Sequence, residues 1–231
     1  MKAGRWFGGE GVFGASGAAP SAVAVLLHGG PEVSLRKPWR ADPGRVRLGA
    51  FVPSIQHAAS RMRASASDGE HASGFSVAVV RVSYEVRGWN GAARSPVADV
   101  ENSLQAIQAK VGPVPVALVG HSMGGRVAAV LAQRPEVAVV VGLAPWWPDD
   151  EARHLRAGQS VLVLHGRGDR VVDPESTRRQ VLAARGRGVA ADWVGMPGGH
   201  GMVSNFRSWH ALTADFVVSR LFEAWNAKHS M

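Results

Sequence analysis

The 231-residue chain contains no cysteine and a single tyrosine, and its basic side chains are 22 arginines against four lysines. The absence of cysteine excludes disulfide frameworks, thiolate metal sites and cysteine nucleophiles. No apolar run reaches the roughly 18 residues that a membrane-spanning helix needs. Glu10 and repeated glycines interrupt the N-terminal stretch where a signal peptide would be apolar. We therefore expect a cytoplasmic protein that has no membrane partner.

The formal net charge of +8 raises the question of nucleic-acid binding. The arginines, however, are spread along the whole chain. The densest groups, at 61–63 and 185–188, are short and have no aromatic residues among them. Proteins that bind nucleic acids usually show a basic patch or a known motif, and neither is present here. We expect a solvated basic surface and no nucleic-acid partner.

Short runs rich in valine and alanine recur along the chain and predict strands. Most of these runs are continuously apolar rather than alternating, which is typical of strands covered on both faces, as in a parallel sheet. The runs are 22–27, 75–84, 114–120, 137–144, 160–166 and 189–196. Segments with helical spacing lie between them. The sequence therefore predicts an α/β fold, a doubly wound and mostly parallel sheet with helices on both faces.

Three of the intervening segments have clear helical features. The first is expected to begin with Ser95 as N-cap and Pro96 at its first position. Its apolar stripe consists of Val97, Val100, Leu104 and Ile107. The second has the same kind of start at Asp173 and Pro174. The third, over 208–227, places Leu212, Phe216, Leu221 and Trp225 loosely on one side.

The sequence shows no internal repeat and no linker between two domains, so we expect one domain over residues 21–231. Residues 1–20 are rich in glycine, and we expect a flexible or weakly ordered arm that holds a weak edge hairpin or no regular structure. Residues 31–74 contain one expected helix, 54–65, within a polar, arginine-rich segment. Connections of this length are often functional loops, so this segment is a candidate cover for the active site.

The sequence Gly120-His121-Ser122-Met123-Gly124 lies between an apolar strand and a helical segment. A Gly-x-Ser-x-Gly turn needs small residues on both sides, because the serine backbone is strained and its neighbours are crowded. Such a turn presents the serine hydroxyl at the carboxyl end of the sheet. Ser122 is therefore the candidate nucleophile, and the alternative is a glycine-rich turn with an incidental serine.

A serine nucleophile needs a base, and the base needs a carboxylate that orients it. Asp169 follows the predicted strand by a few loop residues, so its side chain is expected at the same end of the sheet. Asp173 is a competitor, but it is expected to cap a helix. Asp149 and Asp150 follow the preceding strand and are weaker candidates.

His200 lies between glycines after the last predicted strand and before the last helix, which suits a base that reaches back over the sheet. The backbone N–H groups of Gly30 and Met123 are the candidate oxyanion donors. Pro31 has no N–H to donate, and His28 is expected to brace its loop. The alternative for this glycine pair is a plain turn that ends a strand.

Four segments in this order, LLHGG (26–30), GHSMGG (120–125), LHGRGDRVV (164–172) and GGHG (198–201), resemble the α/β-hydrolase family. The resemblance covers the chain from about residue 22 and implies an eight-stranded, mostly parallel sheet with a triad of Ser122, Asp169 and His200. The segment RVSYEVRGWNG (81–91) is similar to small esterases and dienelactone-hydrolase-like members, although dienelactone hydrolases proper use a cysteine nucleophile.

Two departures from the family pattern are also visible. Family lids usually precede the strand that carries the acid, and here residues 145–159 leave too little chain for a separate cap domain. The first two family strands are hard to find in residues 1–20, so a shortened sheet is expected.

Four residues follow predicted strands at the active end of the sheet and are candidates to line an acyl or aryl pocket: Trp89, Asn90, Trp146 and Trp147. Packing of loops against the core is the alternative role for the tryptophans. Together these features predict a serine hydrolase that cleaves a small ester-like substrate through an acyl-enzyme and needs no metal or organic cofactor. A thioesterase, an acyltransferase, a peptidase and a non-catalytic binding protein on the same fold are the alternatives.

Overall fold

The computed structural model describes residues 12–13, 19–39, 41–65 and 74–229. The expectation of a flexible arm over residues 1–20 lies mostly outside these described residues. Its described part includes Val12–Phe13, which pairs antiparallel with a later strand of the sheet.

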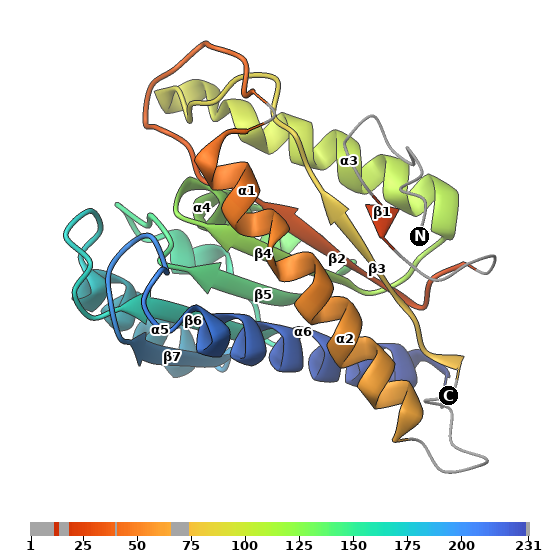
Figure 1. Ribbon diagram of the computed structural model, residues 1–231. Helices are drawn as coiled ribbons and strands as arrows, with labels where there is room; N and C mark the ends of the chain where they lie inside the picture. The colour runs from red at the N-terminus through yellow and green to blue at the C-terminus, as the bar shows by residue number, and fades with distance from the viewer. Residues whose placement is uncertain (1–11, 14–18, 40, 66–73, 230–231) are drawn as a thin grey trace.

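The centre of the fold is a sheet with the strand order β1-β3-β2-β4-β5-β6-β7, and all neighbouring strands except β1 and β3 pair in parallel (Figure 1). The strands are β1 (Val12–Phe13), β2 (Ala22–Leu27), β3 (Val77–Arg81), β4 (Val116–His121), β5 (Val137–Leu143), β6 (Ser160–Gly166) and β7 (Ala190–Met196). Every residue of β2 and of β4 is buried, as the apolar sequence of β2 and the apolar start of β4 predict. The predicted α/β class is confirmed, with seven strands in the described part of the chain rather than the eight that the resemblance implied.

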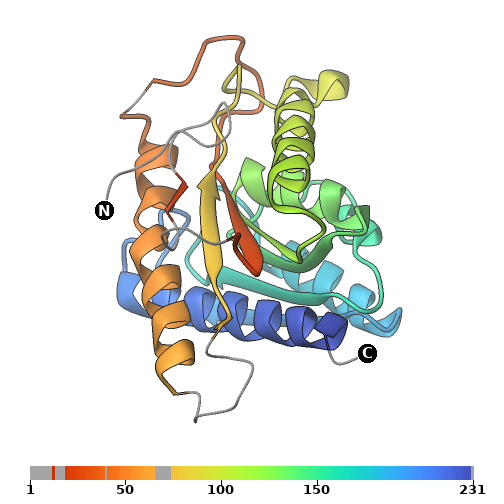
Figure 2. The same ribbon diagram turned by 90° about the vertical axis from the view of Figure 1, so that its right-hand side faces the viewer.

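Helices cover both faces of this sheet (Figure 2). They are α1 (Pro43–Gly49), α2 (Phe51–Ala64), α3 (Ser95–Val111), α4 (Met123–Val130), α5 (Pro174–Gly186) and α6 (Phe206–His229). Buried side chains of α1, α2 and α6 form one core with one face of the strands. Those of α3, α4 and α5 form a second core with the opposite face. This is the doubly wound arrangement that the sequence predicts.

Of the two predicted N-caps, that of α5 is confirmed and that of α3 is wrong. Asp173 caps α5 as expected, since its side chain accepts hydrogen bonds from the backbone N–H groups of Glu175 and Ser176 at 3.0 and 3.1 Å. Ser95 is not the N-cap of α3, because the helix begins at Ser95 itself. The Ser95 hydroxyl instead accepts a hydrogen bond from the side-chain amide of Asn90 at 3.1 Å.

The apolar stripe predicted for the last helix is wrong at one position. Leu212 is 43% exposed, whereas Trp209, Val217 and Leu221 are fully buried against the sheet. A 24-residue helix allows several registers of a loose stripe, and only packing against α2 and the strands selects one of them.

Residues 31–74 hold two helices where the sequence predicted one. The predicted helix is α2, which begins three residues earlier than expected. The additional helix, α1, has seven residues, too few to show a helical period. Its start is fixed by Asp42, whose side chain accepts a hydrogen bond from the N–H of Gly44 at 3.0 Å.

Residues 145–159 contain only the short 3-10 helix η4 (Glu151–His154), so the described residues include no separate cap domain, as predicted. Within the part of the chain that the structure describes, no helix has the length and apolar character needed to cross a bilayer.

Candidate active site

Ser122 forms the turn between β4 and α4, and its backbone is strained. Its φ and ψ angles are 53° and −118°, a conformation that costs a non-glycine residue about 1–3 kcal/mol. Backbone hydrogen bonds on both sides of the residue hold this conformation. The N–H of Ser122 donates to the carbonyl of Leu143 at 3.1 Å, and its carbonyl accepts from the N–H groups of Gly125 at 2.9 Å and Trp146 at 3.0 Å. The end of β5 and the segment after it therefore fix the turn.

The two flanking glycines are required by close backbone contacts. A Cβ on Gly120 would overlap the carbonyl oxygen of Gly124, and a Cβ on Gly124 would overlap the carbonyl oxygen of Leu27. The start of α4 thus packs directly against the end of β2. Ser122 is left half-buried at the carboxyl end of the sheet, as the sequence predicts.

Asp169 lies in the loop after β6 with its carboxylate fully buried. Its Oδ1 accepts hydrogen bonds from the N–H groups of Val171 at 2.8 Å and Val172 at 3.0 Å. Its Oδ2 accepts from Nδ1 of His200 at 2.8 Å and from Nε2 of His165 at 3.0 Å. Burial acts to raise the pKa of Asp169, but the donors Val172, His200 and Val171 outweigh it and hold the pKa below its ordinary value.

His200 lies in the loop between β7 and α6, and its side chain is 18% exposed. Since Nδ1 donates to Asp169, Nε2 carries the lone pair that a general base needs. The loop is tied down by two bonds. The N–H of Gly168 donates to the carbonyl of Gly198 at 2.9 Å, and Nε2 of His121 donates to the carbonyl of His200 at 3.0 Å.

His121 links the loop of His200 to the turn of Ser122. Its ring is buried, and the ring centroids of His121 and His200 are 5.0 Å apart. Burial, and next the nearby charge of His200, lower the pKa of His121 to about 3. A neutral imidazole thus holds the neighbouring loop in place.

The two candidate oxyanion donors lie on adjoining segments. A Cβ on Gly30 would stand 2.7 Å from Cε of Met123. Among the described residues, neither the N–H of Gly30 nor that of Met123 has a hydrogen-bond partner. The N–H of Met123 is also at the start of α4, where the helix dipole favours negative charge.

Helix α1 contacts both loops of the candidate site and lies beside the carboxyl end of β2 (Figure 1). A Cβ on Gly44 would stand 3.0 Å from the carbonyl oxygen of Gly29, next to Gly30. Nη2 of Arg47 is 3.7 Å from the position of a Cβ on Gly201, next to His200.

The structure thus brings Asp169 and His200 into direct contact and places His200 beside His121, the neighbour of Ser122. In the described part of the chain, no hydrogen bond joins Oγ of Ser122 to Nε2 of His200. Such bonds are often long without substrate and tighten when substrate is bound.

Two of the candidate pocket residues are fully engaged elsewhere. Trp147 is 1% exposed, and its indole N–H donates to the carbonyl of Gly125 at 3.0 Å. The Asn90 side chain accepts from the N–H of Ser34 at 2.9 Å and donates to the hydroxyl of Ser95 at 3.1 Å. These contacts argue against substrate contacts for Trp147 and Asn90, because their polar atoms already hold loops together.

The other two candidates pack around a residue that the sequence interpretation missed. The guanidinium of Arg126 lies 4.2 Å from the ring centroid of Trp89 and 4.7 Å from that of Trp146. The same group pairs with Asp149 at 3.0 Å and Glu151 at 2.8 Å. Trp89 is buried in this cluster, whereas Trp146 is half-buried and stays a candidate for substrate contact.

His165 is the second residue that the sequence interpretation missed. Only its spacing, four residues before Asp169, pointed to a relation between the two. Arg126 likewise follows Ser122 by four residues, one helical turn. Neither spacing predicts a contact from the sequence alone, because the partners of His165 and Arg126 come from distant segments that the fold brings together.

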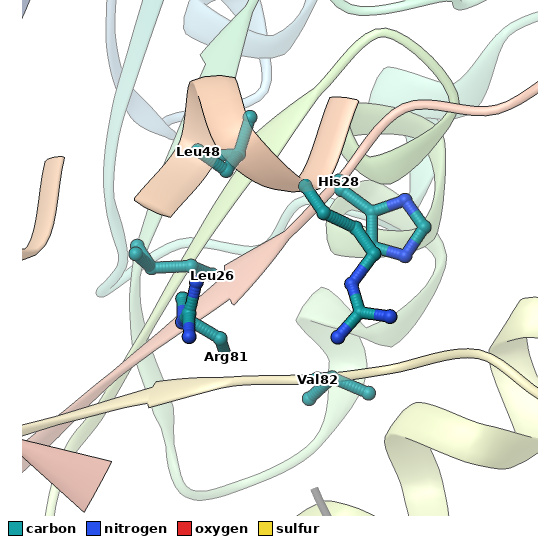
Figure 3. Close-up of a pocket in the computed structure, with 6 residues that line it drawn as sticks. Leu26, His28, Leu48, Arg81 and Val82 are labelled. Carbon is teal, nitrogen blue, oxygen red and sulfur yellow. The ribbon is translucent and has the colours of Figure 1, made fainter. Parts of the chain in front are cut away.

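A small cavity adjoins His28 (Figure 3). It is lined by Leu26, His28, Arg45, Leu48, Arg81 and Val82. Its volume is about 10 Å³, the space of about one water molecule. Burial lowers the pKa of His28 to about 4, and its Nδ1 donates to the carbonyl of Gly29 at 2.8 Å. His28 is therefore a neutral brace of the loop that carries Gly30, as expected. The described residues contain no group of three or more His, Asp or Glu side chains that could hold a metal ion.

The model of the alpha/beta hydrolase fold family matches residues 25–152. These residues are more than half of the chain, and the chain belongs to this family. No curated protein matches the sequence.

Solved structures share the fold at low sequence identity. Esterase 2 of Thermogutta terrifontis with propionate bound has a TM-score of 0.62 and 17% identity, covering 90% of this chain and 88% of that one. Est1E of Butyrivibrio proteoclasticus with ferulic acid bound has a TM-score of 0.61 and 13% identity, with coverages of 91% and 94%. A serine hydrolase homologue from Coxiella burnetii has a TM-score of 0.57 and 16% identity, with coverages of 88% and 88%.

The tight contact at Gly124 gives a first prediction. Gly124→Ala forces a Cβ into the carbonyl of Leu27, so we expect a loss of several kcal/mol in the free energy of unfolding, as for other severe steric insertions. Urea unfolding measures this loss. The matched control is Gly186→Ala, where nothing lies within 4 Å of the added Cβ, and here we expect no loss. Equal unfolding midpoints for the two variants would contradict the packing of α4 on β2.

The buried His121 gives a prediction for the pH dependence of stability. The unfolded chain protonates this imidazole near pH 6.5 and the folded protein only near pH 3, so stability contributed by neutral His121 is lost as the pH falls between these values. At pH 5 the expected loss is about 2 kcal/mol relative to pH 7. His121→Gln keeps an N–H donor but does not titrate, so urea unfolding should show a correspondingly smaller loss. The same loss in both proteins would show that His121 takes no part in the effect.

Proposed function

We propose that this chain is a serine hydrolase that cleaves carboxylic esters through an acyl-enzyme, with Ser122 as nucleophile, His200 as general base and Asp169 as orienting carboxylate. The observation that carries the proposal is the buried hydrogen bond between Asp169 and His200, at the same end of the sheet as the strained turn of Ser122. A structural serine does not need a strained backbone, and a structural aspartate does not need a partly exposed histidine as its partner.

In the first step His200 takes the proton of the Ser122 hydroxyl at Nε2 while Oγ attacks the ester carbonyl. The Asp169 carboxylate keeps the proton of His200 on Nδ1 and stabilises the ring when it becomes positively charged. The low pKa of Asp169 keeps it ionised for this task at neutral pH.

The N–H groups of Gly30 and Met123 are proposed to bind the oxyanion that forms on the substrate. Both are without a partner among the described residues, so no bond within the protein has to break before they act. Removal of one such donor costs other enzymes about 3–4 kcal/mol of transition-state stabilisation.

His200 then protonates the leaving alcohol and activates a water molecule, which releases the acid from Ser122. No metal or organic cofactor is needed for either half of the reaction. A thioesterase or acyltransferase would use the same residues and differ only in the leaving group or in the acceptor of the acyl group.

Small esters are the proposed substrates. Structural neighbours are esterases described with propionate, butyrate and ferulic acid bound. Helix α1, which contacts the loops of Gly30 and His200, is the proposed cover of the site in place of a cap domain. Trp146 is the proposed aromatic wall. We keep the cytoplasmic location as a prediction.

The proposal predicts the kinetics of two conservative variants on p-nitrophenyl esters from acetate to decanoate. Ser122→Ala should abolish turnover. Asp169→Asn should lower kcat about 10³- to 10⁴-fold, because its amide N–H₂ cannot accept from His200 and favours the wrong tautomer. The acyl chain of the ester with the highest kcat/KM then indicates the length of the acyl pocket.

Arg179→Gln, an exposed change on α5, serves as the control and should retain wild-type rates. Faster turnover of thioesters or acyl transfer to an added alcohol would favour the alternative enzymes. Equal and unmeasurable rates in wild type and Ser122→Ala would favour a binding role instead.

A further inference from the structure

His165 at the end of β6 is buried against Asp169, and the proposed mechanism gives it no step. Its side chain is completely buried, and its Nε2 lies 3.0 Å from Oδ2 of Asp169. This is the same oxygen that accepts Nδ1–H of His200 at 2.8 Å. One carboxylate oxygen therefore serves two histidines.

The hydrogen-bond partners assign the tautomer of His165. A carboxylate oxygen only accepts, so Nε2 of His165 carries the proton. Burial is the largest cause that lowers the pKa of His165, so the ring is neutral and Nδ1 is an acceptor. The Thr177 hydroxyl, whose Oγ1 lies 2.8 Å from Nδ1, is the donor within reach of this acceptor.

Thr177 is in turn held by its own neighbours. The indole N–H of Trp193 donates to Oγ1 of Thr177 at 3.2 Å. The single hydroxyl proton of Thr177 is shared between two acceptors, Nδ1 of His165 and the carbonyl of Pro174 at 2.9 Å. When the Thr177 hydroxyl points to His165, the bonds run in one direction, from Trp193 through Thr177 and His165 to Asp169. Each donor in such a chain polarises the next, which strengthens the last donation to Oδ2.

We propose that His165 is a positioning residue for the proposed triad: its Nε2–H holds Oδ2 of Asp169 in place and shares the negative charge of that oxygen with His200. The inference rests on the proposed function. Oδ1 of Asp169 is fixed by two backbone N–H groups, whereas on Oδ2 the only donor besides His200 among the described residues is His165. Without His165, the full charge of Oδ2 faces the imidazole of His200.

Removing His165 is therefore expected to raise the pH at which His200 loses its proton. A more negative Oδ2 stabilises the protonated form of His200, so His200 would hold its proton to higher pH. The other titratable and charged groups at this site are His121, which packs on His200 from the end of β4, and Arg47 of α1, whose charge acts on His121. The test variants leave both groups unchanged.

The experiment compares the pH profiles of kcat/KM for wild type, His165→Leu and His165→Gln on the best p-nitrophenyl ester. His165→Leu removes the donor, and we expect the midpoint of the acid limb to move upward by roughly half a pH unit or more. The side-chain amide of His165→Gln places an N–H near the position of Nε2, so we expect it to bring the midpoint back toward the wild-type value.

Leu104→Ala is the control for a merely structural effect, because Leu104 is a fully buried core residue of α3 and is not one of the proposed site residues. The Leu104→Ala variant should have a lower thermal unfolding midpoint than wild type and the same acid-limb midpoint in its kcat/KM profile. A His165→Leu variant that also lowers the thermal midpoint but keeps the wild-type pH profile would overturn the inference.

A second readout separates this inference from the proposed function. In the Ser122→Ala background, NMR titration of the His200 imidazole needs no turnover, and the same upward movement is expected on adding His165→Leu. If that double variant does not fold, Thr177→Val weakens the same chain and should move the titration in the same direction by a smaller amount. An unmoved titration overturns the role of His165 even if the esterase proposal stands, and absent turnover with a moved titration overturns only the esterase proposal.

Discussion

The carboxylate of Asp169 holds together the segments that make up the candidate site. It is buried, and burial alone would favour its neutral form. Two N–H groups of its own loop and that of His200, in the loop after β7, reverse that preference. His165 at the end of β6 also donates to this carboxylate. An ionised group in the interior is tolerated only with such partners, so any change that moves one of these segments weakens the others.

The turn of Ser122 is the other constraint, and here the backbone rather than a charge is decisive. The strained conformation persists because β5, the segment after it and the first turn of α4 supply hydrogen bonds, and because glycine lets α4 approach the end of β2. Strain of this kind is usual at functional sites, where the surrounding structure over-determines one residue. The neutral His121 then joins this turn to the loop of His200, so the two halves of the site are held by one buried ring.

Local patterns in the sequence predict the strands, the cap at Asp173 and the Asp169–His200 contact, because each depends on residues that are neighbours in the chain or on the parallel order of strands. The contacts that they do not predict are formed between distant segments. His165 meets Thr177 and Trp193 only when α5 and β7 pack on β6, and Arg126 meets Trp89 only when two loops close over α4. The exposure of Leu212 and the short helix α1 are not predicted for the same reason, since neither a loose stripe nor seven residues determine a helical register. The domain boundaries and the catalytic roles stay predictions.

The central claim is that His200 and Asp169 activate the hydroxyl of Ser122 for attack. The most direct test is reaction with a fluorophosphonate, followed by the intact mass and by peptide mapping of the modified residue. The account predicts one adduct, on Ser122, that forms much more slowly in His200→Ala. No adduct, an adduct on another serine, or an unchanged rate in His200→Ala would contradict it.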